Sequence, residues 1–259
     1  MKKIYAILLI LSLTVSLLSF VGCEFDFPGM TVPGSSTSTT KPKTSSTTST
    51  TSTTQKGDGG NPDHPEMGSV GLLYELIENL AGFKVVGIGS CTDKELVIPS
   101  EYMGLPVTSI GAGAFDSCDI TSVYVPNTVN AIEATAFKWC RSLKTITFEN
   151  NSKLESIQGD AFAFCTALEN IVIPDTVKYI GGGAFNECSS MKKVEMGSSV
   201  EYIGRLAFGD CLSLDEIKYS GTAEQWAEIK KDEKWIWSID TMRFYVVCSD
   251  ETLYVVEKN

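Results

Sequence analysis

The stretch AFAFCTALENIVIPDTVKYIGGGAF, residues 161–185, contains one complete copy of a motif that this chain repeats. Ala-Phe-x-x-Cys occurs five times, and successive phenylalanines are 22, 25, 23 and 23 residues apart. An isoleucine stands five residues before each phenylalanine. The phenylalanines are Phe115, Phe137, Phe162, Phe185 and Phe208. A nearly fixed period predicts a solenoid, in which each coil buries its apolar edge against the next coil.

Apolar and polar residues alternate after each cysteine, as in TSVYVP at 121–126 and ENIVIP at 169–174. This period of two predicts one short strand per coil, and stacked coils pair such strands in parallel about 4.8 Å apart. Pro99, Pro126 and Pro174 end their strands because proline lacks the amide donor of the ladder. Within the repeated motif, alanine and cysteine are four residues apart, which predicts a short helical turn with both pointing inward.

One repeat is longer than the others. FENNSKLESI at 148–157 has two more residues than IPDTVKYI at 173–180. Because the extra residues fall between two core positions, we expect a loop to absorb them.

The repeated unit AF-x-x-C-x-x-L-x-x-I-x-I-P-x-x-V-x-x-I-G resembles the BspA-type leucine-rich repeat, over about residues 83–220. The segments at 82–111 and from 219 onward resemble the end caps of that family. The resemblance implies an α/β solenoid of the leucine-rich repeat class, with parallel strands, short helical turns and end caps. It also implies an exported, often adhesive, bacterial surface protein without catalytic residues.

Both ends of the solenoid need a cover, because end coils would otherwise expose apolar faces. TAEQWAEIKK at 222–231 predicts a short helix, with Thr222 and Gln225 forming a capping box and Trp226 and Ile229 facing inward. For GLLYELIENLAGF at 71–83, periodicity alone allows a helix, whereas the family resemblance favours a hairpin.

The organisation before the repeats is that of an exported protein. Residues 1–23 carry two lysines and an apolar stretch that ends in FVGC, which resembles the bacterial lipobox except that Phe20 replaces its usual leucine. We expect a lipid on Cys23 and display at the bacterial cell surface; an uncleaved helix and ordinary secretion are the alternatives. Residues 24–67 form a Ser/Thr-rich tether that cannot bury a core. Residues 68–259 form the repeat domain, with a cap and half-repeat at 68–109, repeats at 110–219 and a second cap at 220–259.

Charge and composition narrow the function. A net charge of −11 disfavours a nucleic-acid partner and leaves the lipid as the only membrane contact. The one histidine, His64, lies in the tether, so the sequence offers no catalytic triad. The five repeated cysteines form a column rather than a cluster, which disfavours zinc and disulfides and favours packed thiols. We therefore predict no cofactor, no metal and no enzyme activity.

The outward side of the strands is the candidate ligand surface, since a solenoid presents such rows as an extended face. The predicted contacts are Val97, Tyr124, Thr147, Val172, Glu195 and Lys218. Three tryptophans near the C-terminus could instead stack on sugars, although filling the cap is the favoured interpretation. The predicted function is adhesion to an extracellular protein or glycan. The alternatives are an envelope scaffold or spacer without its own ligand and an accessory of polysaccharide-processing enzymes.

Overall fold

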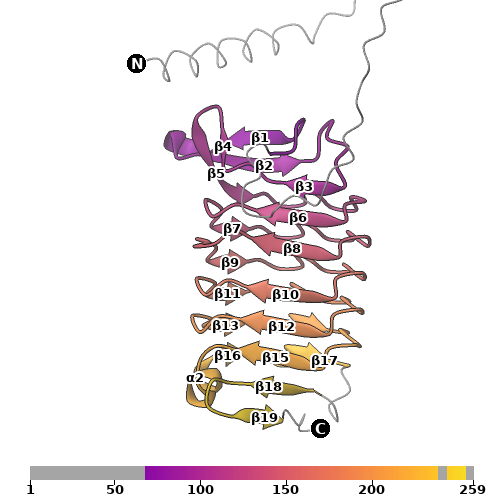
Figure 1. Cartoon of the computed structure of the whole chain (residues 1–259), viewed down its shortest axis with the longest axis vertical. Coiled ribbons are helices and arrows are strands. Elements are labelled where there is room, and N and C mark those ends of the chain that lie inside the picture. Colours follow the sequence, from indigo (N-terminus) through magenta and orange to yellow (C-terminus); the bar gives the residue numbers. More distant parts are fainter. Residues whose placement is uncertain (1–67, 239–243, 255–259) are drawn as a thin grey trace, which may run out of the picture. The chain divides into compact units, whose positions relative to one another are not determined.

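The computed structural model describes residues 68–238 and 244–254, and these form a solenoid of stacked coils (Figure 1). Most coils contribute a long strand to one side, and parallel pairing between neighbouring coils joins these strands into two sheets rather than one. The long strands are β3 (Glu95–Val97), β6 (Ser122–Val125), β8 (Thr145–Phe148), β10 (Asn170–Ile173), β12 (Lys193–Met196), β15 (Glu216–Tyr219) and β18 (Tyr245–Val247). The predicted leucine-rich repeat solenoid with parallel strands is confirmed.

A further parallel sheet, which the sequence did not predict, runs along another side of the coils. It is built from the isoleucines that precede each phenylalanine motif, in strands of mostly two residues that are too short for an alternating pattern to show. After β5 (Leu105–Ile110) it continues through β7 (Ala131–Ile132), β9 (Ser156–Ile157), β11 (Tyr179–Ile180), β13 (Tyr202–Ile203) and β16 (Lys230–Lys231).

The repeated Ala-Phe-x-x-Cys segment is a turn rather than the short helical turn that the sequence predicted. The residue before each cysteine has a left-handed backbone, for example Trp139 with φ 63° and Phe164 with φ 62°. Such a residue breaks a right-handed helix and directs its N–H to the neighbouring coil: the amide of Trp139 donates to the Ala163 carbonyl at 2.8 Å. The amide of Phe137 donates likewise to the Ala161 carbonyl at 2.8 Å. In its last copy the segment includes β14 (Phe208–Gly209), which pairs with β17 (Ile236–Trp237).

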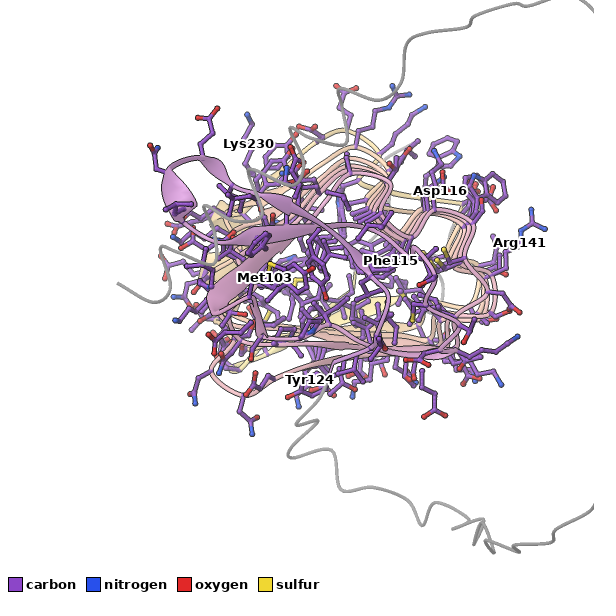
Figure 2. The ribbon with its side chains drawn as sticks, turned by 90° about the horizontal axis from the view of Figure 1, so that it is seen from above. Met103, Phe115, Asp116, Tyr124, Arg141 and Lys230 are labelled. Atoms are coloured by element: carbon purple, nitrogen blue, oxygen red, sulfur yellow. The ribbon has the colours of Figure 1, made fainter. Side chains whose placement is uncertain are left out.

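The five phenylalanines form a continuous stack inside the coils. Neighbouring ring centroids are 5.1–5.4 Å apart, with interplanar angles of 14° or less. All five rings are fully buried, and Figure 2 shows Phe115 inside the coil. Each repeat therefore contributes the same buried phenylalanine ring to the interior of the solenoid.

The cysteine column behaves as packed thiols. Cys140, Cys165, Cys188 and Cys211 are fully buried, while Cys118 in the first coil is partly exposed. All the cysteines of the described residues are free. Each buried thiol donates a hydrogen bond to the phenylalanine carbonyl of the preceding motif, as Cys140 Sγ does to the Phe115 oxygen at 3.0 Å. The same carbonyl also accepts from the amide of its own motif's cysteine, as Phe115 does from Cys118 at 3.1 Å, so the thiol adds a second hydrogen bond to it.

The two caps form as predicted. Strand β1 (Leu73–Leu76) pairs antiparallel with β2 (Phe83–Gly87), so the N-terminal segment is a hairpin, with a single 3₁₀ turn, η1 (Glu78–Leu80), between its strands. β4 (Glu101–Tyr102) folds back on β5. At the other end, α2 (Ala223–Glu228) begins with the predicted capping box of Thr222 and Gln225 and buries Trp226. The edge of the long-strand sheet is then covered by β19 (Thr252–Tyr254), which is antiparallel to β18.

Within the described residues, no helix has the length and hydrophobicity needed to cross a membrane. The predicted leader, Cys23 and the tether lie outside the described residues.

Candidate ligand-binding groove

Strand register decides which predicted contacts become neighbours. Val97 pairs with Tyr124, and Tyr124 pairs with Thr147. Val172 pairs with Glu195, and Glu195 pairs with Lys218. The expected single row of six is therefore two rows of three, because β8 and β10 do not pair. Figure 1 shows these two strands farther apart than their neighbours in the sheet.

The break is also visible in the hydrogen bonds that link the coils just before each long strand. There the amide of Lys144 donates to the Thr121 carbonyl at 2.9 Å, and the amide of Lys192 donates to the Glu169 carbonyl at 2.7 Å. The equivalent bond from the Glu169 amide to the Lys144 carbonyl is absent from this part of the described chain. The break coincides with the two-residue insertion, which directly follows β8.

A groove of about 760 Å³ lies at this break. Its lining includes the end of β8, the loop at 149–152 that contains the insertion, and the following coil from Val172 to Thr176. It continues over the next coils to Glu195, Lys218 and Ser220. Four of the six candidate contacts line the groove, namely Thr147, Val172, Glu195 and Lys218. Val97 and Tyr124 are not part of its lining. Tyr124 lies on the outer side of the coils, as Figure 2 shows, and its strand β6 is separated from β10 by β8 and the break.

The insertion is held in place by its neighbours. The Thr176 hydroxyl donates to the carbonyls of Ser152 and Leu154, at 3.2 and 2.7 Å. Leu154 is fully buried, because it occupies the core position that valine has in other repeats. The Glu149 carboxylate accepts from the Asn127 amide at 2.8 Å. These bonds order one wall of the groove before any ligand arrives.

The opposite end of the groove carries a network of charges. Glu195 contacts both Lys193 and Lys218, at 3.3 and 3.4 Å, and Lys193 also contacts Glu216 at 3.2 Å. Partial burial raises the pKa of Glu195, but hydrogen bonds from Lys193 and Lys218 outweigh it, so the pKa is lowered and the side chain is ionised at neutral pH. Glu195 and Lys218, from neighbouring coils, thus form an exposed ion pair beside the groove.

Asp175 is a groove residue that the sequence analysis missed. It accepts a hydrogen bond from the Ser220 hydroxyl at 3.3 Å, and it has no ion-pair partner among the described residues. Gly197 makes this position possible, since an added Cβ would lie 2.2 Å from the Asp175 Cα. The insertion in the printed sequence was the available signal, because it marks where the strand ladder breaks.

The C-terminal tryptophans lie mainly in the cap. The Trp235 ring packs edge to face against Phe208, Trp226 and Phe244, with centroids 5.9–6.5 Å apart. Trp237 is exposed, and the Lys234 ammonium lies over its ring at 4.2 Å. Among the described residues, no group of three His, Cys, Asp or Glu side chains is placed to hold a metal ion.

Comparison with known proteins agrees with the fold. A family model for the BspA type leucine rich repeat region matches residues 108–229 in six copies. A leucine-rich repeat protein of T. pallidum is 26% identical with a TM-score of 0.55, and the match covers 65% of this chain and 81% of that chain. A leucine-rich cell surface protein from Faecalibacterium prausnitzii A2-165 is 31% identical with a TM-score of 0.53. That match covers 62% of this chain and 41% of that chain, so it spans less than half of the relative. No curated protein matches the sequence. Residues 108–229 are therefore a BspA-type leucine-rich repeat region.

Proposed function

We propose that this protein is a non-enzymatic binding module displayed at the bacterial cell surface, and that its ligand lies in the groove at the break between β8 and β10. The observation that carries the proposal is the convergence of four outward side chains, Thr147, Val172, Glu195 and Lys218, on one preformed groove. Residues of a purely structural solenoid face need not converge in this way.

The exposure of Val172 supports a binding role. Its side chain is 62% exposed on the groove, although valine normally gains stability from burial. An apolar side chain surrounded by hydroxyl, amide and charged groups is typical of the mixed chemistry of binding surfaces. Display at the surface follows from the predicted leader and lipid on Cys23, and the F. prausnitzii relative is described as a cell surface protein.

The test is a binding screen of the full chain, purified in mild detergent, against matrix proteins, mucins and glycans. Val172→Arg fills the groove without disturbing the core, so we expect it to abolish saturable binding. Leu212→Arg is the matched control, because Leu212 is 63% exposed, lies outside the groove and receives the same new side chain.

A ligand that tolerates Val172→Arg but is lost with Leu212→Arg would refute the groove as the binding site. A screen without any saturable ligand would favour the scaffold or spacer alternative instead.

A further inference from the structure

The groove carries more negative than positive charge, and this favours cationic ligands over neutral or anionic ones. Three carboxylates line it, from Glu149, Asp175 and Glu195, and Lys218 is the only lysine or arginine in the lining. Lys218 and Lys193 together offset Glu195, whereas the hydrogen bond that the Asp175 carboxylate accepts from a side chain of the described residues comes from the neutral Ser220 hydroxyl. The groove thus keeps negative charge that an approaching cation can neutralise, and the net charge of −11 attracts cations from a distance.

The groove also has a length that suits an extended chain. It crosses the strands β8, β10, β12 and β15, with two paired steps of ~4.8 Å and a wider step at the break, so it spans at least about 15 Å. An extended polypeptide advances about 3.3 Å per residue, which corresponds to about four or five residues. Its main-chain amides and carbonyls can pair with the hydroxyl and amide side chains of Thr147, Asn150 and Ser220 along the lining.

From this geometry and charge, we propose that the ligand is an extended polypeptide segment carrying lysine or arginine side chains. The proposal rests on the proposed function and names its ligand class. Asp175 contacts a cationic side chain in the middle of the groove, with Glu149 available to a second one near the insertion. A neutral glycan would leave these carboxylates without a counter-charge, and an anionic glycan would be repelled.

The test uses a fluorescein-labelled peptide of eight residues that alternates lysine and alanine, titrated with the full chain in mild detergent and followed by anisotropy. Matching peptides with glutamine or glutamate in place of lysine measure the dependence on charge. We expect only the lysine peptide to bind, and we expect its affinity to fall as the salt concentration rises from 50 to 200 mM. We expect Asp175→Asn to weaken it about three-fold or more and Val172→Arg to abolish it.

Asp116→Asn is the matched control. It removes the same charge from an exposed aspartate on a different side of the coils from Tyr124, as Figure 2 shows. Equal weakening by Asp116→Asn and Asp175→Asn would show that the acidic surface as a whole attracts the peptide, and it would overturn the inference. Binding of the glutamine or glutamate peptide as tightly as the lysine peptide would overturn it too.

The two proposals fail in distinguishable ways. A ligand from the screen that requires Val172 but is a glycan, an amino sugar polymer included, would leave the proposed function standing and overturn the polypeptide inference. Both proposals would be overturned if Val172→Arg left the binding of every screen ligand unchanged and also left the binding of the lysine peptide unchanged.

Discussion

The buried thiol of Cys140 leads to a prediction about alkaline stability. Its side chain is fully buried, and burial raises the pKa of the thiol from its ordinary value of 9.0 to about 12. Between those two pH values the unfolded chain releases this proton while the folded chain keeps it. The unfolded state then binds fewer protons, so the free energy of unfolding falls as pH rises above 9.

The magnitude follows from the size of this window. At pH 10 the medium is one unit above 9.0 and still below 12, so one such thiol lowers the free energy of unfolding by about 1.4 kcal/mol. Cys140→Ala removes this effect but also deletes a buried sulfur and its bond to the Phe115 carbonyl. By analogy with the loss of one buried methylene and a weak hydrogen bond, that deletion costs about 1–2 kcal/mol at pH 7.

The variant is therefore expected to be destabilised by about 1–2 kcal/mol at pH 7 and to be nearly as stable as the parent at pH 10. Urea denaturation followed by circular dichroism, with a phosphine reductant present, measures both differences. Val129→Ala is the control, because Val129 is fully buried and cannot ionise, so its cost should be the same at both pH values. A cost of Cys140→Ala that does not shrink between pH 7 and pH 10 would refute the reasoning.

Three further changes test other parts of the molecule by separate measurements. Phe162 stacks on two phenylalanine rings and Phe115 on one. Phe162→Leu should therefore lower the free energy of unfolding, measured with urea, by about 0.5–1.5 kcal/mol more than Phe115→Leu does. Equal losses in the two variants would mean that stacking adds nothing to burial. Gly197→Ala places a Cβ against Asp175, so it should weaken binding of the lysine peptide as Asp175→Asn does; unchanged anisotropy would contradict the packing. Cys23→Ala should abolish labelling by a fatty-acid probe and release the protein from membranes, and a variant that stays labelled would exclude Cys23 as the lipid site.

The repeat made much of the fold predictable, because each coil solves the same packing problem with the same residues. The phenylalanine column, the buried cysteines and the parallel pairing of the long strands all follow from a period that can be read by eye. The capping box of Thr222 and Gln225 was predictable for a different reason, since it depends only on local spacing. The N-terminal hairpin was not decided by periodicity, which allowed a helix over the same residues.

Two local features escaped the sequence because they depend on neighbouring coils. A spacing of four residues suits a helical turn, yet Trp139 and Phe164 adopt left-handed backbones so that their amides reach the next coil. The sheet of short strands likewise depends on stacking, since a two-residue strand such as Tyr179–Ile180 is defined by its pairing with the strands of the neighbouring coils.

The candidate site, like the fold, has features that the sequence predicts and features that depend on contacts between coils. The architecture and the outward-facing positions of the strands could be predicted from the sequence, because alternation and period are local properties that every repeat shows. The sequence also located the two-residue insertion. The separation of β8 and β10 at that point, and the position of Asp175 over Gly197 near Ser220, became visible once the coils were stacked in three dimensions. Those outcomes depend on the balance of hydrogen bonds and packing between different coils, which no single repeat encodes.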